Sequence, residues 1–158
     1  PPDYLTEVKD GAFYGWPYVY FKDYADPTQV QLNPDKVKQA KQTSLMPDLP
    51  LDAHSVPLGL LFHSGKNIDG KYKDGAFVVR RGGVSTSKLT GYDVLFIPFI
   101  DGKPTGIIET FLSGFIASED RGEIFGRPVG IAETNNGEII ITDDVGGRLL
   151  MISPTERE

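Results

Sequence analysis

The stretch that decides the fold is residues 126–154, which reads GRPVGIAETNNGEIIITDDVGGRLLMISP. It contains three apolar segments of strand length, at residues 128–132, 138–142 and 148–153. Turns with Asn-Gly and Gly-Gly separate them, and these dipeptides supply the positive φ of tight reversals. We therefore predict an antiparallel meander, in which the β-branched run Ile139-Ile140-Ile141 forms a strand covered on both faces.

The same pattern occurs earlier in the chain. Residues 57–60 match 128–131, residues 75–79 match 137–141, and residues 91–98 match 147–154 from Gly to Gly and Pro to Pro. Internal similarity of this kind is typical of repeated sheet units. A unit of about four strands in roughly 40–60 residues fits a β-propeller blade better than a solenoid rung. We predict an all-β fold of four-stranded antiparallel propeller blades, with a partial blade over 1–56, a blade over 57–125 and a final partial blade over 126–158.

Composition excludes several classes of protein. The net charge of −6 leaves no basic stripe to neutralise phosphates, so we expect no nucleic-acid partner. The chain has no cysteine, which excludes disulfides and thiolate metal sites. No apolar run approaches the roughly 20 residues of a membrane span. A start at Pro1-Pro2, without an initiator Met, is typical of a processed or excised chain.

The N-terminal part contains a helix signal and an aromatic cluster. Asn33 as a cap, Pro34 at the first helical position and Asp35 in the first turn predict one short helix that ends near Lys41. The aromatic cluster consists of Phe13, Tyr14, Trp16, Tyr18, Tyr20 and Phe21. We expect it to pack between neighbouring sheets, and the alternative is a stacking wall for a flat ligand.

An ordered set of short motifs resembles the C-terminal half of the sorbosone dehydrogenase-like family, which are soluble sugar (aldose) dehydrogenases that use pyrroloquinoline quinone (PQQ). The motifs are Pro2-Asp3-Tyr4-Leu5, Lys9-Asp10-Gly11, Phe13-Tyr14-Gly15-Trp16-Pro17-Tyr18, His54-Ser55, Pro57-Leu58-Gly59, Gly75-Ala76-Phe77, Gly91-Tyr92, Phe96-Ile97-Pro98-Phe99, Gly114-Phe115, Gly126-Arg127-Pro128-Val129-Gly130 and Asp143-Asp144-Val145-Gly146. The resemblance covers nearly the whole chain.

The resemblance implies a six-bladed propeller, of which 158 residues hold about half. It also implies PQQ at the mouth of the central channel, with calcium beside it. The implied reaction is hydride abstraction from an aldose or aldehyde carbon, with a histidine as general base. In the family that histidine lies in the N-terminal half, which this chain does not include. We expect a periplasmic or extracellular location and a small sugar as the substrate.

One stretch departs from the family pattern. Residues 81–86 read Arg-Gly-Gly-Val-Ser-Thr where the family reads close to His-Gly-Ser-Trp-Asn-Arg, so an anchoring guanidinium is missing from its usual place at Thr86. Arg80 or Arg81 could substitute for it. Because side chains alternate along a strand, the two arginines cannot both face the channel.

Two further residues are candidates for binding the cofactor. Arg127 matches the family position best and could grip a carboxylate bidentately, and its alternative is a surface ion pair with Glu123 or Asp120. His54 precedes a strand and could bind sugar or cofactor, although a structural hydrogen-bonding role is its alternative. The proposed cofactor site therefore consists of Arg127, Arg80, Arg81 and His54.

The remaining polar residues carry weaker signals. Asp143 and Asp144 could bind calcium through their oxygens, but an aspartate before a Gly-rich turn also caps its own backbone, so we assign no metal ligand. Lys66 lies in a loop that could approach an anionic ligand, and a solvated lysine is the ordinary case. His63 falls at the end of a strand and carries no motif.

Two functions remain open from the sequence. The first is part of a quinoprotein oxidoreductase that oxidises an aldose or sugar aldehyde with PQQ and is inactive as this chain alone. The second is a non-catalytic half-propeller module that binds a sugar or a protein partner. Because a cut ring leaves blade faces without partners, we expect a homodimer or a complex with a complementary N-terminal half. The faces expected to be uncovered carry Leu60, Phe77, Val79, Phe96, Ile139 and Ile141.

Overall fold

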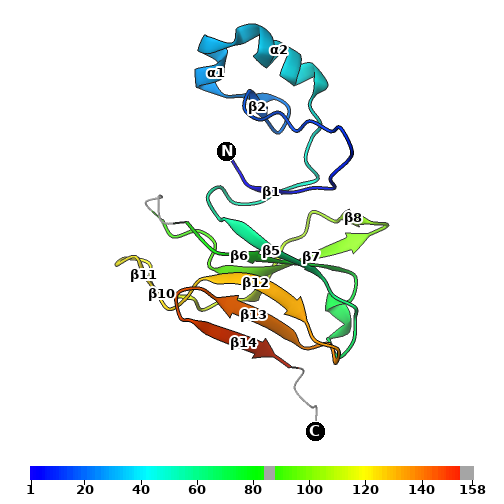
Figure 1. The fold of residues 1–158 in the computed structure, drawn as a ribbon, viewed down its shortest axis with the longest axis vertical. Helices are drawn as coiled ribbons and strands as arrows, with labels where there is room; N and C mark the ends of the chain where they lie inside the picture. The colour runs from blue at the N-terminus through cyan, green and yellow to red at the C-terminus, as the bar shows by residue number, and fades with distance from the viewer. Residues whose placement is uncertain (84–87, 154–158) are drawn as a thin grey trace. The chain divides into compact units, whose positions relative to one another are not determined.

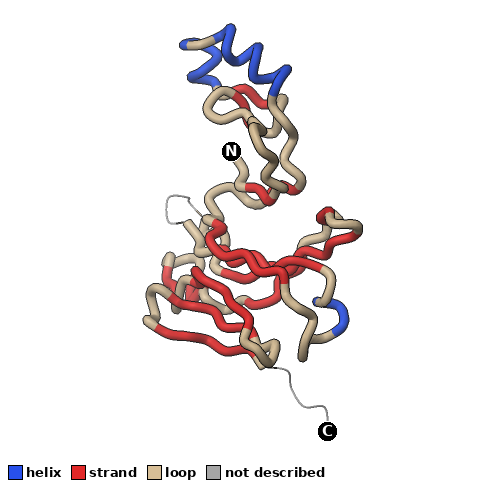
Figure 2. The backbone as a smooth tube through the Cα atoms, turned by 45° about the vertical axis from the view of Figure 1, so that its right-hand side comes forward, coloured by secondary structure: helices blue, strands red, loops and turns tan. Residues whose placement is uncertain are grey.

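The computed structural model describes residues 1–83 and 88–153 (Figure 1). The chain forms two compact units, Pro1–Leu51 and Asp52–Glu158. The α-helices belong to the first unit, and strands dominate the second (Figure 2). Of the altered stretch, Val84, Ser85 and Thr86 lie outside the described residues. No helix in the described part of the chain is long and apolar enough to cross a membrane.

The first unit has little sheet. Its elements are β1 (Tyr4–Leu5), β2 (Val19–Tyr20), β3 (Tyr24–Ala25), α1 (Pro27–Leu32), α2 (Pro34–Thr43) and β4 (Leu49–Pro50). The antiparallel pairs are β1 with β4 and β2 with β3. The assignment of residues 1–56 to a partial blade stays a prediction, because this unit offers only these two-residue pairs.

The helix α2 confirms its sequence signal. It begins at Pro34 after the cap Asn33 and ends at Thr43, two residues beyond the predicted Lys41. The sequence reading missed α1, although Asp26 and Pro27 carry the same kind of signal. The Asp26 carboxylate accepts a hydrogen bond from the Gln29 amide at 3.0 Å, which is an N-cap followed by a proline at the first position.

The aromatic cluster packs against a helix and not between sheets. Phe13 and Tyr18 pack on a small core to which α2 contributes Val37 and Ala40. Trp16 is 78 % exposed. The predicted packing role therefore holds for part of the cluster, with a different partner.

The second unit begins with a sheet in which four strands run antiparallel in the order β5-β6-β7-β9. The strands are β5 (Pro57–Phe62), β6 (Gly75–Arg80), β7 (Asp93–Ile100) and β9 (Glu109–Leu112), with the 3₁₀ turn η1 (Gly70–Tyr72) in the β5–β6 connection and β8 (Lys103–Pro104) paired to the end of β7. All six residues of β6 are buried. We call these strands the first sheet.

The second sheet is the predicted meander. It consists of β12 (Pro128–Glu133), β13 (Ile139–Asp143) and β14 (Arg148–Ile152) in sequential antiparallel order, and the short hairpin of β10 (Ile116–Ser118) and β11 (Glu123–Ile124) precedes it. Ile139 and Ile141 are buried, whereas Ile140 is partly exposed. Among residues 1–83 and 88–153, the second sheet is covered on one face, so the prediction that this strand is covered on both faces is wrong.

Strand pairing aligns the two sheets more firmly than sequence identity does. Pro57 pairs with Arg80, and its counterpart Pro128 pairs with Asp143. The Gly-to-Gly match would instead place Arg80 level with Thr142. The strand pairings instead align Arg80 with Asp143, which differs by one residue from the alignment by sequence.

The two sheets pack face to face around one core. The core consists of Phe77, Val79, Val94, Phe96, Ile139 and Ile141, each at most 2 % exposed. The first strands approach closely, since a side-chain carbon at Gly59 would lie 2.8 Å from the Val129 carbonyl oxygen. Adjoining first strands and face-to-face sheets are the arrangement of neighbouring propeller blades.

This core corrects the list of uncovered residues. Phe77, Val79, Phe96, Ile139 and Ile141 bury one another inside the chain. Of the six residues expected on open faces, the exposed one is Leu60, at 51 %. The homodimer or complementary half stays a prediction, and it has to rest on other residues.

Candidate functional site

The four candidate residues lie at one end of the second unit. Arg80 ends β6 and Arg81 follows it, whereas His54 and Arg127 stand just before β5 and β12. Because β6 runs antiparallel to β5 and β13 runs antiparallel to β12, the ends of β6 and β13 lie beside the starts of β5 and β12. We call this the arginine end of the two sheets.

Arg80 is buried and engaged by two carboxylates. Its Nε and Nη2 donate to Asp93 at 2.7 and 2.6 Å, and its Nη1 donates to Asp52 at 2.6 Å. Burial lowers the pKa of the Arg80 guanidinium, but the hydrogen bonds with Asp93 and Asp52 outweigh it and raise that pKa above the ordinary value. Arg80 therefore stays charged and ties the segment that carries Asp52 and His54 to the first sheet.

Arg81 links the first sheet to the second. Its Nε donates to the Asp144 carboxylate at 2.7 Å, and its side chain is 29 % exposed. Its amide donates to the Val56 carbonyl. Arg80 bonds to Asp93 of its own sheet and to Asp52 before β5, whereas Arg81 bonds to the second sheet. Opposite directions of neighbouring side chains are expected from their alternation along a strand.

Arg127 is held by its backbone and leaves a side-chain donor without an acceptor. Its amide donates to Asp143 at 2.8 Å, and its carbonyl accepts from the Asp144 amide at 3.0 Å. In the described part of the chain, its Nε is buried and has no hydrogen-bond partner. Glu123, one of the alternative partners predicted for Arg127, is engaged by Arg121 at 2.9 Å.

Asp143 organises the turn between β13 and β14. One carboxylate oxygen accepts from the amides of Arg127, Val145 and Gly146, and the other accepts from the Arg148 guanidinium at 2.7 Å. Burial would raise the pKa of Asp143, but these donors outweigh it and lower the pKa to about 2. The carboxylate caps its own turn, which is the alternative that the sequence offered to calcium binding.

His54 presents an exposed side chain on a constrained backbone. Its φ is +62°, an unusual value for a residue other than glycine. Its carbonyl oxygen lies where a side-chain carbon at Gly83 would come within 2.4 Å, so residue 83 has to be a glycine. Together with the Asp52–Arg80 ion pair, this contact fixes the segment before β5.

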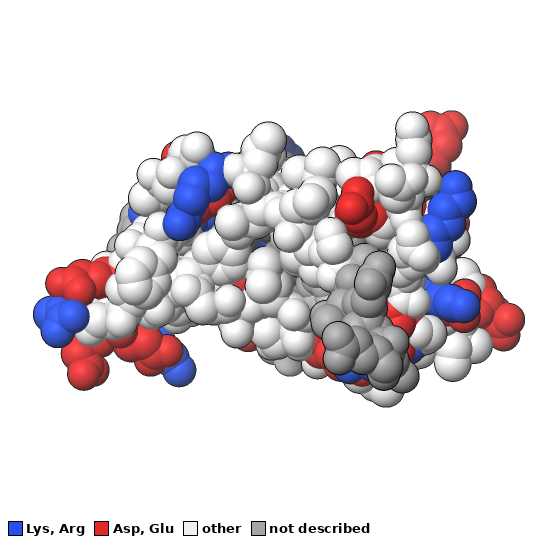
Figure 3. Space-filling view, turned by 90° about the horizontal axis from the view of Figure 1, so that it is seen from below, with Lys and Arg blue, Asp and Glu red and all other residues white. Residues whose placement is uncertain are grey.

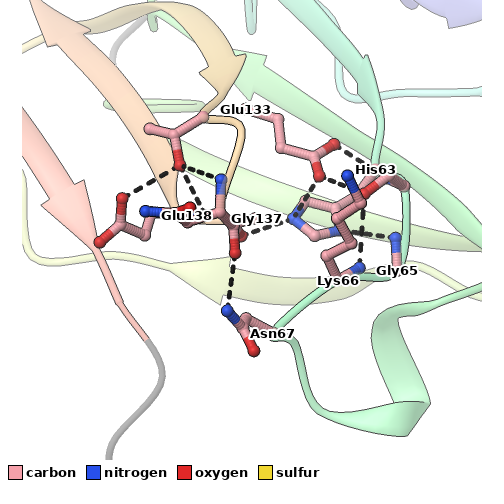
Figure 4. Close-up of polar contacts among 10 residues, drawn as sticks. His63, Gly65, Lys66, Asn67, Glu133, Gly137 and Glu138 are labelled. Atoms are coloured by element: carbon pink, nitrogen blue, oxygen red, sulfur yellow. Dashed lines mark hydrogen bonds and ion pairs between the residues drawn. The ribbon is translucent and has the colours of Figure 1, made fainter.

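The opposite end of the sheets carries a histidine whose role the sequence did not reveal (Figure 4). His63 is buried, and its Nδ1 accepts from the Gly65 amide at 3.0 Å while its Nε2 lies 2.9 Å from the Gly137 carbonyl. The proton therefore sits on Nε2. Ser64 donates its amide and its hydroxyl to Glu133. These bonds join the loop after β5 to the β12–β13 hairpin, and no local motif could have indicated them.

Two weaker candidates also have their places. Lys66 belongs to the loop after β5, so it lies away from the arginine end. Among residues 1–83 and 88–153, no group of three or more histidine, aspartate or glutamate side chains that could hold a metal ion is found. On the described part of the face drawn in Figure 3, basic side chains are interspersed with acidic ones.

Comparison with known proteins gives one family. The family model described as TrAA12-like matches residues 6–155. An uncharacterized protein of Borreliella burgdorferi is 32 % identical over 96 % of this chain and 39 % of its own length. The chain spans about two fifths of the length of that relative.

Solved structures give the same fold. A Trichoderma reesei structure of Carbohydrate-Active Enzymes Family AA12 superposes with a TM-score of 0.70 at 17 % identity, over 92 % of this chain and 40 % of its own. The PQQ domain of pyranose dehydrogenase from Coprinopsis cinerea gives 0.66 at 18 % identity, over 90 % and 40 %. The soluble aldose sugar dehydrogenase of Escherichia coli gives 0.60 at 17 % identity, over 98 % and 38 %. The resemblance to soluble PQQ-dependent sugar dehydrogenases and the all-β propeller class are thereby confirmed.

Proposed function

Because this chain belongs to the TrAA12-like family, we propose that it is part of a quinoprotein oxidoreductase that oxidises an aldose or sugar aldehyde with PQQ. The observation that carries the proposal is the buried Nε of Arg127, which has no acceptor among the described residues. Buried donors are almost always paired. A carboxylate of the quinone would supply the missing acceptor at the end of the sheets where the arginines gather.

The residues of the arginine end fit such an anion. PQQ carries carboxylates, and a protein binds them best with guanidinium groups that stay charged and present planar donors. Arg127 would bind one carboxylate through its unpaired donor. Arg81 is partly exposed and would contribute charge while it keeps its bond to Asp144. When bound, PQQ would accept the hydride from the sugar.

The other two residues have supporting roles in this proposal. The guanidinium of Arg80 is occupied by Asp93 and Asp52, so Arg80 orients the segment before β5 instead of touching the cofactor. His54 lies on that segment with its side chain exposed, and it would contact sugar or cofactor. No residue of this chain is assigned as the general base.

The resemblance adds three further expectations to the proposal. These are calcium beside the quinone, for which we assign no ligand in this chain, a sorbosone-type or other aldose substrate, and a periplasmic or extracellular location. The chain spans about two fifths of its relatives' length, and the resemblance places the base in the other part. We therefore propose that the isolated chain is inactive.

The second candidate function is a non-catalytic module that binds a sugar or a protein partner. The altered stretch after Arg80 favours it, because the family's Asn-Arg pair is replaced by Ser85 and Thr86. The two functions differ in one observable property, since only the first requires the chain to bind PQQ.

Calorimetric titration of PQQ into the chain tests the proposal. A hydrogen bond to a charged group contributes about 1.5–3 kcal/mol, so Arg127→Gln is expected to weaken PQQ binding about 10- to 150-fold. His54→Ala is expected to have a smaller effect. The matched control is Arg121→Gln, an exposed arginine paired with Glu123, which should leave the affinity unchanged.

Two outcomes would contradict the proposal: a chain that does not bind PQQ, or an Arg127→Gln variant that binds it as well as the unmodified chain. Sugar binding without PQQ binding would favour the module. A dye-linked assay with PQQ, calcium and aldoses should detect no turnover by the isolated chain. Robust turnover would refute its proposed inactivity.

A further inference from the structure

The turn between β12 and β13 contains Asn136 followed by Gly137, and Asn136 is the only asparagine of the chain that precedes a glycine. An asparagine can lose its side-chain amide without an enzyme when the backbone nitrogen of the next residue attacks the side-chain carbonyl carbon. Glycine favours this attack, because it has no side chain to obstruct the approach and its backbone adopts many conformations. The proposed function makes no use of this dipeptide, whose role in the fold is to reverse the chain.

In the folded chain, the nitrogen that would attack is engaged in the turn. The Gly137 amide donates to the Thr134 carbonyl at 3.0 Å, and the Thr134 amide donates to the Glu138 carbonyl at 2.9 Å. Gly137 has a φ of +90°, a left-handed value that suits glycine. Its nitrogen has to leave the Thr134 carbonyl and lose its proton before it can bond to Asn136. The closed turn therefore suppresses the reaction, and an opened turn permits it.

The loop after β5 holds this turn closed (Figure 4). The Asn67 side-chain amide donates to the Asn136 carbonyl at 2.7 Å, and His63 Nε2 donates to the Gly137 carbonyl at 2.9 Å. The Lys66 carbonyl oxygen lies so close to Gly137 that it would clash with a side-chain carbon there. Asn136 is exposed, so water reaches its side chain while the backbone on either side is held.

We propose that Asn136 is a site of spontaneous deamidation, and that the contacts from the loop after β5 set its rate. The Gly137 nitrogen bonds to the side-chain carbon of Asn136. Its proton passes through solvent to the departing side-chain nitrogen, which leaves as ammonia. Water then opens the resulting five-membered imide at either of its two carbonyl groups. The products are aspartate and isoaspartate at position 136, and the reaction needs no oxidant or reductant.

Isoaspartate at this position changes the join between the two sheets. It continues the main chain through its side-chain carbon, so the backbone between residues 136 and 137 becomes longer. The two carbonyl groups that Asn67 and His63 hold then lose their present spacing. The new carboxylate also enters a hairpin that already carries Glu133 and Glu138, where a further negative charge is unfavourable. The reaction therefore loosens the contact between the loop after β5 and the second sheet.

Peptide mass spectrometry during incubation at neutral pH tests the proposal by following the conversion of Asn136. The variant Asn67→Gly removes the donor and keeps a residue that tolerates the φ of +45° at this position. Loss of one hydrogen bond raises the population of the opened turn, so the variant should convert about 2- to 12-fold faster. The matched control is Asp101→Gly, at an exposed residue with a φ of +50° between β7 and β8, which should leave the rate unchanged.

Two measurements on the unmodified chain do not depend on a variant folding. In urea, where the turn is open, Asn136 should convert roughly tenfold faster or more than in the folded chain. In the isoaspartate form, separated by ion exchange, the Gly65 amide should exchange its hydrogen faster, because its bond to His63 belongs to the loosened contact. Equal conversion rates in the folded and unfolded chain, or an unchanged rate in Asn67→Gly, would overturn the proposed control by the loop. An unchanged Gly65 amide would overturn the proposed loosening.

Discussion

The two sheets of the second unit differ in the ion pair at equivalent ladder positions. This pair is Arg80–Asp93 in the first sheet and Arg148–Asp143 in the second. In the first sheet the arginine is the buried partner, because the side chain of Arg80 is 9 % exposed and needs both Asp93 and Asp52 to satisfy it. In the second sheet the signs are exchanged, and Asp143 is buried while Arg148 is 52 % exposed. Both sheets carry an ion pair at this position. Whether the arginine or the aspartate is the buried partner depends on the donors and acceptors that the neighbouring segments provide.

The sheets also differ in how much they are covered. The strand β6 is buried along its length, whereas β13 and β14 are covered on one face. The same ladder position can therefore be a core residue in one sheet and a surface residue in the other. Three measurements test this comparison.

The largest contrast is expected between Phe96→Ala and Met151→Ala. Their positions are equivalent, because Phe96 lies three residues after Asp93 in β7 and Met151 lies three residues after Arg148 in β14. Phe96 is 1 % exposed in the core, so its truncation should lower the free energy of unfolding by about 4 kcal/mol. Met151 is 63 % exposed, so its truncation should change it by less than about 0.5 kcal/mol in the monomer. Urea unfolding at a concentration where the chain is monomeric measures both. Equal losses would refute the difference in coverage between the two sheets.

The next contrast is between Arg80→Met and Arg148→Met. Removing Arg80 leaves Asp93 buried without its partner, which should cost about 3 kcal/mol. Removing Arg148 should cost about 1 kcal/mol, because Asp143 keeps its three backbone donors. Thermal unfolding of both variants ranks them, and a larger loss for Arg148→Met would mean that the turn does not hold Asp143.

The third measurement concerns the dependence of stability on acid pH. The pKa of Asp143 falls from its ordinary 3.8 to about 2 on folding. Its ionised form therefore contributes about 2 kcal/mol above pH about 4, and this contribution is lost as the pH falls toward 2. Asp143→Asn should lower the stability at neutral pH and flatten this part of the acid profile, whereas Asp144→Asn should keep the acid-dependent loss. Unfolding midpoints measured between pH 7 and 2 decide it, and an unchanged profile in Asp143→Asn would contradict the cause.

Much of the local structure follows from the sequence. The three strands of the meander, the turns between them and the start of α2 lie close to where the residue pattern puts them, because Asn-Gly, Gly-Gly and Asn-Pro act on their own backbone. The arginine end could be predicted in part, since Arg80, Arg81, Arg127 and His54 do lie at the same end of the sheets. Whether they bind PQQ stays a prediction.

Other features were beyond the sequence. The hydrogen bonds of His63 and Ser64 join the loop after β5 to Gly137 and Glu133, and no local sequence pattern indicates them. The Arg80 ion pairs depend on Asp52 and Asp93, which lie 28 and 13 residues away in the chain. The one-residue offset between the sheets appears only when the strands are paired.

The sequence by itself determined where strands and turns form, since these depend on side-chain periodicity and on residues that tolerate positive φ. It also determined the family, through motifs whose order is a property of the chain. The tertiary structure decided which arginine is consumed by carboxylates and which keeps a free donor, and which sheet face is covered. Burial and pairing of this kind arise between segments distant in the chain, and their free energy depends on what lies opposite each side chain rather than on its sequence neighbours.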